Sequence, residues 1–381
     1  MNRFRSVRIA ALLCAAAFSL LVACTPSKKY LVEHGRETVT RESAYIKVFV
    51  LKSQEPVSVA ALGTIRVSNL KTRSIDYERT DSKVVFSADK VMTPVLVEST
   101  SNWVEINGVR YRGMAELHNV MGSISVINVV RLDDYLFSVV PSEMSPSWPA
   151  EALKAQAVAA RTYAYYHILK KRSDLYDLDA TTNFQVYKGV AAEKAESTKA
   201  VTETAGQIMT YENKPVLAFF HSTCGGATID GKYVWSGEDL PYLREVRCPY
   251  CAKSPYYRWE ESLSMPELKR CISARYNVGQ IQGISFDRFH GRVIDATIRH
   301  RNGTLKISGN DFRQMFPEKR IKSMYFSAAK KGKNFLFEGR GWGHGVGMCQ
   351  YGAKGLADKG AEYKKILQYY YRGVSIDTIS R

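Results

Sequence analysis

The stretch EGRGWGHGVGMCQYGAKGLA, residues 338–357, carries five glycines at alternate positions within nine residues. Because side chains alternate between the two faces of a β-strand, this spacing predicts a strand that is bare on one face. Glycine costs conformational entropy, so stability alone does not explain the pattern. We expect a neighbouring chain segment or a ligand to lie against this bare backbone, with Trp342, His344 and Gln350 beside it.

A second segment, SPSWPAEALKAQAVAARTYAYYHILKK (residues 145–171), predicts a long helix over 149–171. Ser147 is a suitable N-cap, and Pro149 fits the first turn of a helix. The apolar residues that recur at helical spacing are mostly alanine, so another element must approach closely. The glycine-rich stretch is the expected partner of this alanine-rich face.

The chain from Tyr45 to about Val130 has the pattern of β-strands, and Asn107-Gly108 is a hairpin turn signal. The sequence therefore predicts an α+β fold. A β-rich portion over residues 45–130 merges with a mixed core over 131–378, which contains the alanine-rich helix and the glycine-rich strand.

The N-terminus reads MNRFRSVRIAALLCAAAFSLLVACTPSKK. Basic residues followed by a short apolar run predict a signal peptide over 1–23, and Leu-Val-Ala-Cys resembles a lipobox with lipid attachment to Cys24. Residues 24–44 are polar and are expected to form a spacer. The prediction is an exported lipoprotein at the cell envelope, held to the membrane by its N-terminal lipid; a plain signal peptide is the alternative.

Composition predicts a folded protein with an anionic partner. Hydrophobic residues make up 45% of the 381 residues, and the formal charge is +17. Loss of the leader, which holds three arginines and no acidic residue, would lower that charge to +14. A basic exported protein suits a cell-wall polymer or an anionic lipid. Export and the lack of a nucleic-acid-binding motif argue against a nucleic-acid partner.

Glu143 lies in VVPSEMSPSWP, between an apolar segment expected to be a strand end and a proline-rich turn before the predicted helix. Its apolar neighbours would raise the pKa of the carboxyl, as a general acid requires. The alternative is a glutamate that only stabilises the start of a helix through the macrodipole.

Several motifs together resemble the SpoIID (sporulation stage II protein D) family over roughly Ile46 to Ile376. They are LDDYLFSVVPSEM, WPAEALKAQAVAARTYA, FHSTCGGAT, VWSGEDLPYL, SGNDFRQMF and GRGWGHGVGMCQYGAKGLA. The resemblance implies a lytic transglycosylase that cleaves peptidoglycan between N-acetylmuramic acid and N-acetylglucosamine, leaves 1,6-anhydro ends, and in some members prefers peptide-free strands. It also implies that Glu143 is the catalytic acid. The alternative within the family is a non-catalytic glycan-binding protein that enhances a cell-wall amidase.

One carboxyl can perform this reaction, because the acid that protonates the leaving oxygen can then deprotonate the sugar's own 6-hydroxyl. A hydrolase instead needs two carboxylates. Asp133 and Asp134 are the alternative candidates for a second one.

The same resemblance, with the local sequence, predicts a set of substrate-binding residues. They are Lys154, Gln156, Arg161, Gln185, Tyr187, Ser222, His344, Gln350 and Tyr351. From spacing alone, the row of Lys154 and Arg161 could equally be a solvated helix face.

The cysteines offer a metal site or a disulfide. His221-x-x-Cys224 followed by Cys248-x-x-Cys251 has the ligand types and spacing of a four-coordinate zinc site. With all four positions filled by protein, such a zinc would be structural. Export favours disulfides instead, although three cysteines leave one unpaired. Cys271 is expected to be a buried small residue in a helix opened by a capping box.

Overall fold

The structure is a computed structural model that describes residues 44–80, 83–170, 173–182, 184–235, 237 and 239–379. The described residues belong to one compact unit. The predicted signal peptide and Cys24 lie outside them, as does all but the last residue of the predicted spacer. Among the described helices, none is long and apolar enough to cross a membrane.

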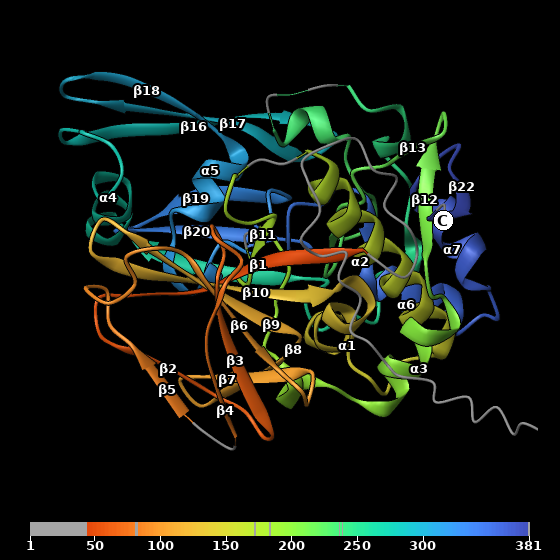
Figure 1. The fold of residues 1–381 in the computed structure, drawn as a ribbon. Coiled ribbons are helices and arrows are strands. Elements are labelled where there is room, and N and C mark those ends of the chain that lie inside the picture. The colour runs from red at the N-terminus through yellow and green to blue at the C-terminus, as the bar shows by residue number, and fades with distance from the viewer. Residues whose placement is uncertain are drawn as a thin grey trace, which may run out of the picture. The chain divides into compact units, whose positions relative to one another are not determined.

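The β-rich portion forms a seven-stranded sheet in the order β11-β1-β10-β9-β6-β3-β4 and a four-stranded sheet in the order β5-β2-β7-β8 (Figure 1). Its strands are β1 (Tyr45–Ser53), β2 (Val57–Ala60), β3 (Thr64–Asn69), β4 (Ile75–Thr80), β5 (Lys83–Phe86), β6 (Val95–Ser99), β7 (Trp103–Ile106), β8 (Val109–Arg112), β9 (Met114–Val120) and β10 (Ser123–Arg131). The short β11 (Leu178–Asp179) pairs in parallel with β1. Asn107 and Gly108 have positive φ and join β7 to β8, so the predicted hairpin is confirmed.

The mixed core is built around two helices, α1 (Leu132–Glu143) and α2 (Ala150–Lys170). The predicted helix over 149–171 is confirmed as α2. It packs against α1, α3 (Ala195–Glu203), α6 (Gln350–Ala357), α7 (Tyr363–Tyr370) and β12 (Gln207–Tyr211). Alanine allows this many neighbours to approach, and most of α2 is buried. The remaining strands of the core are β13 (Lys214–Pro215), β14 (Phe220–His221), β21 (Met348–Cys349) and β22 (Ser375–Thr378).

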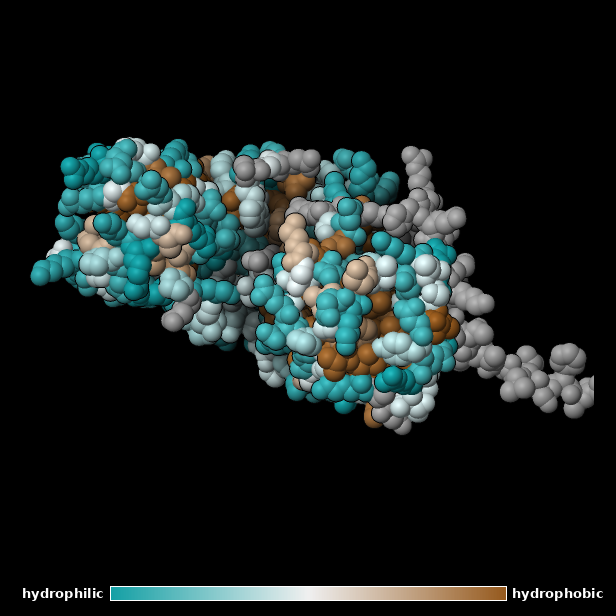
Figure 2. All heavy atoms as spheres, turned by 60° about the vertical axis from the view of Figure 1, so that its left-hand side comes forward, coloured by the Kyte–Doolittle hydropathy of each residue, from teal (hydrophilic) through white to brown (hydrophobic). Residues whose placement is uncertain are grey.

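Residues 259–339 form what we call the second lobe, which has a hydrophobic core of its own. It contains β15 (Trp259–Ser264), α4 (Met265–Ser273), β16 (Ile281–Phe289), β17 (Arg292–His300), β18 (Gly303–Ser308), α5 (Gly309–Gln314), β19 (Phe326–Lys331) and β20 (Asn334–Gly339). Ser264 and Glu267 form the predicted capping box of α4, and Cys271 is buried in that helix. The face shown in Figure 2 is mostly hydrophilic, with hydrophobic residues gathered in patches.

The glycine-rich stretch is not the regular strand that its spacing predicted. Strand β20 ends at Gly339 and β21 begins at Met348. Between them every second residue is a glycine with a φ between 68° and 112°, which a β-ladder cannot accommodate. Isolated bridges join Trp342 to Thr223 and Gly343 to Ser323. We call residues 340–347 the glycine loop.

The glycine loop packs on residues 219–225, not on the alanine-rich helix. A Cβ on Gly347 would overlap the carbonyl oxygen of Phe219, and one on Gly343 would stand 2.8 Å from the Cβ of His221. The predicted packing of the alternating glycines on the alanine-rich helix was therefore wrong, although α6, the C-terminal part of the same stretch, does pack against α2. The alanine face of α2 instead accommodates its helical neighbours, and the glycines let the loop lie directly on the segment that contains β14.

Candidate functional site

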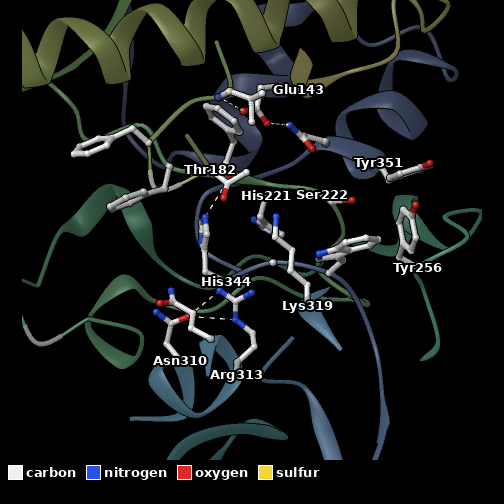
Figure 3. A pocket seen from close by; sticks show the side chains of 18 of the residues that line it. Glu143, Thr182, His221, Ser222, Tyr256, Asn310, Arg313, Lys319, His344 and Tyr351 are labelled. Atoms are coloured by element: carbon white, nitrogen blue, oxygen red, sulfur yellow. Dashed lines mark hydrogen bonds between the residues drawn. The ribbon is translucent and has the colours of Figure 1, made fainter. Parts of the chain in front are cut away.

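A pocket of about 840 Å³ lies between the second lobe and the rest of the mixed core. The end of α1, the segment around β14 and the glycine loop supply one side of it, and α5 with the turn after it supplies the other. Figure 3 shows Glu143 and Arg313 on opposite sides of this space, with His221, His344 and Lys319 between them.

Glu143 is the last residue of α1, so the segment before it is a helix and not the strand end that we predicted. The carboxyl sits at the negative end of the helix macrodipole, which disfavours its charged form. The alternative of a glutamate that stabilises a helix start is therefore wrong. Burial raises the pKa of Glu143, partly offset by hydrogen bonds from the Val186 amide and from Gln350. Such a carboxyl retains its proton to a higher pH than an exposed glutamate does.

Two hydrogen bonds hold the Glu143 side chain. The Val186 N–H donates to Oε1 at 3.1 Å, and Gln350 Nε2 donates to Oε2 at 3.5 Å. Gln350 is in turn held by Gln156, whose Oε1 lies 3.5 Å from the same nitrogen. Gln156 is fully buried behind Gln350, and its Nε2 has no hydrogen-bond partner among the described residues. Gln156 thus orients Gln350 and does not reach the pocket.

The two histidines of the pocket are neutral and fixed in orientation. His344 Nδ1 accepts from the Val346 N–H at 3.1 Å, so its Nε2 donates to the Phe220 carbonyl at 2.9 Å. His221 Nδ1 donates to the Val346 carbonyl at 3.0 Å. Burial lowers the pKa of His221 to about 3. His221 Nε2 is therefore an unprotonated acceptor, buried without a partner among the described residues, on the pocket wall.

Aromatic side chains cover part of the wall near Glu143. The ring centroids of Trp148 and Tyr351 are 4.7 Å apart, and those of Tyr256 and Trp342 are 4.1 Å apart. All four rings line the pocket. Because sugar rings have apolar faces, such a wall with polar groups around it suits a glycan.

Of the predicted substrate-binding residues, Ser222, His344, Gln350 and Tyr351 line the pocket. Lys154 instead pairs with Glu151 and Glu203, while Arg161 is fully buried against Asp133 at 2.7 Å. The buried Gln185 accepts from Tyr135, and the buried Tyr187 donates to Asn128. None of these four side chains lines the pocket, and all four contact other parts of the protein.

The alternative second carboxylates do not face Glu143. Asp133 is held by Arg161, and neither Asp133 nor Asp134 lines the pocket. Glu143 is the single carboxylate among the described residues of the pocket wall.

Four cysteines form a buried cluster beside the pocket. The sulfur atoms of Cys224, Cys248, Cys251 and Cys349 all lie within 4.8 Å of one another, and all four residues are free cysteines. Ligands of a tetrahedral metal at about 2.3 Å stand about 3.8 Å from each other, which fits this cluster. The predicted set was wrong in one member, because the fourth residue of the cluster is Cys349, and His221 is not among the grouped ligand atoms. The cluster could bind a metal, and the disulfide alternative is not formed by these cysteines.

Sequence reasoning missed the contribution of the second lobe to the pocket. Arg275, Asn310, Arg313 and Lys319 line it, with Tyr256 just before the lobe. The motif SGNDFRQMF, residues 308–316, was a usable signal, since it contains two of these residues and a Ser308 N-cap. No short motif in the sequence, however, indicates that this lobe lines the same pocket as Glu143.

Comparison with known proteins gives two family matches. Residues 120–211 match the SpoIID family, described as stage II sporulation protein, and residues 250–347 match a domain of unknown function, DUF8618. An uncharacterized protein of Brachyspira hyodysenteriae is 38% identical over 291 residues, which is 75% of this chain and 77% of the relative. Stage II sporulation protein D of Bacillus amyloliquefaciens is 35% identical over 65% of this chain and 74% of the relative. The amidase enhancer of Bacillus subtilis is 28% identical over 73% of this chain and 45% of the relative.

Proposed function

The chain belongs to the SpoIID family, and on that premise we propose that it is a peptidoglycan lytic transglycosylase. It cleaves glycan strands between N-acetylmuramic acid and N-acetylglucosamine and leaves 1,6-anhydro ends, with a preference for peptide-free strands. The observation that carries the proposal is the single described carboxylate of the pocket wall, Glu143, with a raised pKa beside an aromatic wall.

In the first step Glu143, protonated, donates its proton to the glycosidic oxygen as the bond from that oxygen to C1 of the muramyl sugar breaks. The N-acetylglucosamine end leaves with the proton, and positive charge develops on the muramyl ring. The raised pKa of Glu143 supports this role, because the acid must be protonated at the start.

In the second step the Glu143 carboxylate takes the proton of the sugar's 6-hydroxyl, whose oxygen attacks C1 and closes the anhydro ring. The tethered hydroxyl replaces water, so no second carboxylate is required. The Val186 and Gln350 donors stabilise the carboxylate between the steps.

The second candidate is a glycan-binding protein that stimulates a cell-wall amidase without cleaving glycan. Similarity to a protein named amidase enhancer favours it. The two functions share a pocket and differ in whether the Glu143 proton is needed.

We further propose that the four-cysteine cluster holds a structural zinc ion. Four thiolates are a closed donor set with no position left for water. Cys349 directly precedes Gln350, and Cys224 follows the pocket residue Ser222 by two positions. A bound zinc would therefore fix two pocket segments to each other.

The proposed location is the outer face of a membrane, with the chain exported and anchored by lipid on Cys24. The lipobox-like sequence supports this. Mass spectrometry of the mature N-terminus tests it, because a diacylated or triacylated Cys24 is expected and an unmodified N-terminus contradicts it.

The activity is tested by incubating the purified protein with peptide-free glycan strands in water enriched in oxygen-18. The proposal predicts anhydro-muramyl ends that carry no oxygen-18. Reducing ends that carry oxygen-18 would show a hydrolase. Binding and amidase stimulation without any cleavage would show the enhancer.

A further inference from the structure

Positive charge outweighs negative charge on the described pocket wall. Arg275, Arg313 and Lys319 line it, and Glu143 is the carboxylate opposite them. Because Glu143 has a raised pKa and is neutral in the acid role, the excess of positive charge is largest when substrate arrives. Arg275 and Lys319 are exposed, whereas Arg313 is half-buried. Arg275 donates to the Gln314 carbonyl at 3.0 Å, and the side chains of Arg313 and Lys319 point into the pocket (Figure 3).

Arg313 is a half-buried cation without an acidic partner among the described residues. Its Nε and Nη2 donate to Asn310 Oδ1 at 3.3 and 3.0 Å, and Asn310 is neutral. Burial lowers the pKa of Arg313 to about 10, and no neighbouring carboxylate raises it again. A guanidinium has five N–H donors, so most of them remain available to a ligand. Burying a charge without a counter-ion is unfavourable, which indicates that a ligand supplies the anion.

Lys319 is the second cation of this pair. Its φ of 52° is unusual for a residue with a side chain, and it ends the 3-10 turn Pro317–Lys319 that follows α5. Backbone held in this region is often found where function requires a particular orientation. Lys319 lies near enough to Glu143 to lower that carboxyl's pKa. Figure 3 places Lys319 between Glu143 and Arg313.

We propose that Arg313 and Lys319 form a carboxylate receptor, and that its ligand is the lactyl carboxylate of the muramyl sugar whose bond is cleaved. This inference rests on the proposed function. The lactyl ether is attached to C3 of the same ring that carries the reacting C1, so its carboxylate enters the pocket together with the scissile bond. Where a stem peptide is attached, that carboxyl is an amide and carries no charge. Arg313 and Lys319 are then the residues that determine the preference for peptide-free strands, because an arginine binds a carboxylate through charge-assisted, often bidentate hydrogen bonds.

The test compares three glycan substrates with the purified full-length chain. They are peptide-free strands, the same strands with the lactyl carboxylate converted to a methylamide, and strands that keep their stem peptides. The variants are Arg313→Gln and Lys319→Gln, and the control is Arg301→Gln, which removes an equal charge from an exposed turn of the same lobe.

We expect the wild type and Arg301→Gln to cleave peptide-free strands about tenfold to a hundredfold faster than methylamide strands. This factor corresponds to the free energy of one hydrogen bond to a charged group. Arg313→Gln should cleave peptide-free strands more slowly by most of that factor, and its rate on methylamide strands should change little. Lys319→Gln should reduce the same preference.

Equal wild-type rates on the first two substrates would overturn the receptor and leave the transglycosylase intact. An Arg313→Gln variant that slows both substrates equally would also overturn it, since Arg313 would then only position the lobe. Faster cleavage of peptide-bearing than of methylamide strands would assign the recognised carboxylate to the stem peptide and refute the lactyl assignment.

Binding to the Glu143→Gln variant separates this inference from the proposed activity. If no protein cleaves glycan, the receptor still predicts at least tenfold tighter binding of peptide-free than of methylamide strands. The double variant Glu143→Gln with Arg313→Gln should show a much smaller difference in binding, and adding Lys319→Gln should abolish it. Equal binding by Glu143→Gln itself would refute the receptor whatever the activity.

Discussion

Replacing Gly347 with alanine tests whether the glycine loop exists to let the backbone pack on the segment around β14. Gly347 has a φ of 68°, and a Cβ there would overlap the Phe219 carbonyl oxygen and stand 3.1 Å from the Tyr371 ring. A left-handed backbone costs an alanine about 1–2 kcal/mol. Overpacking a close-packed site costs about 1–3 kcal/mol more. The free energy of unfolding should therefore fall by about 2–5 kcal/mol.

The control is Gly360→Ala, because Gly360 has a similar φ of 84° and nothing within 4 Å of its would-be Cβ. It should lose only the backbone contribution of about 1–2 kcal/mol. Urea unfolding followed by circular dichroism measures both variants against wild type. If Gly347→Ala loses no more than Gly360→Ala, the loop is not held by this contact, and the explanation of the alternating glycines is refuted.

Three further predictions follow from other parts of the structure. Cys349→Ser should lower the zinc content of protein purified without chelator, measured by elemental analysis, whereas Cys271→Ser should leave close to one zinc per chain; absence of zinc from the wild type would contradict the metal site. Arg161→Gln should lower the free energy of unfolding by about 3–5 kcal/mol, because Asp133 loses its buried partner, without changing KM for glycan; an increased KM at unchanged stability would return Arg161 to the substrate-binding set. The cleavage rate should fall as pH rises through the raised pKa of Glu143, because only the protonated carboxyl can donate; a rate that increases over that range in a pH–rate profile would contradict the assignment of the acid.

The sequence correctly predicted the secondary-structure elements whose signals lie within a short segment of the chain. The alanine-rich helix, the Asn107-Gly108 hairpin and the Ser264 capping box are confirmed because their signals lie within a few residues of each other. The segment before Glu143 was misread, since its valines and Pro141 suggest a strand end. Burial of Tyr135 and its neighbours decides in favour of helix α1, which shows tertiary packing overriding propensity.

The sequence predicted individual site residues such as Glu143. It did not predict the contacts that depend on segments far apart in the chain. Glu143 and Gln350 lie together as hydrogen-bonded neighbours, 207 positions apart in the chain. Cys349 lies in the cysteine cluster because the glycine loop before it folds onto the segment around β14. The spacing of His221 and Cys224 contains no information about that contact. Arg313 belongs to a lobe with its own core, and its approach to the pocket is a property of tertiary structure alone.

The central claim is that Glu143 catalyses glycan cleavage by donating its proton to the glycosidic oxygen. The rate at which Glu143→Gln forms anhydro-muramyl ends tests this claim most directly. Glutamine keeps the size of the side chain and cannot transfer the proton, so folding and glycan binding should persist. The rate should fall by about 10²–10⁴-fold, as for loss of a general acid–base group. A Glu143→Gln variant that releases anhydro-muramyl ends as fast as wild type would contradict the account.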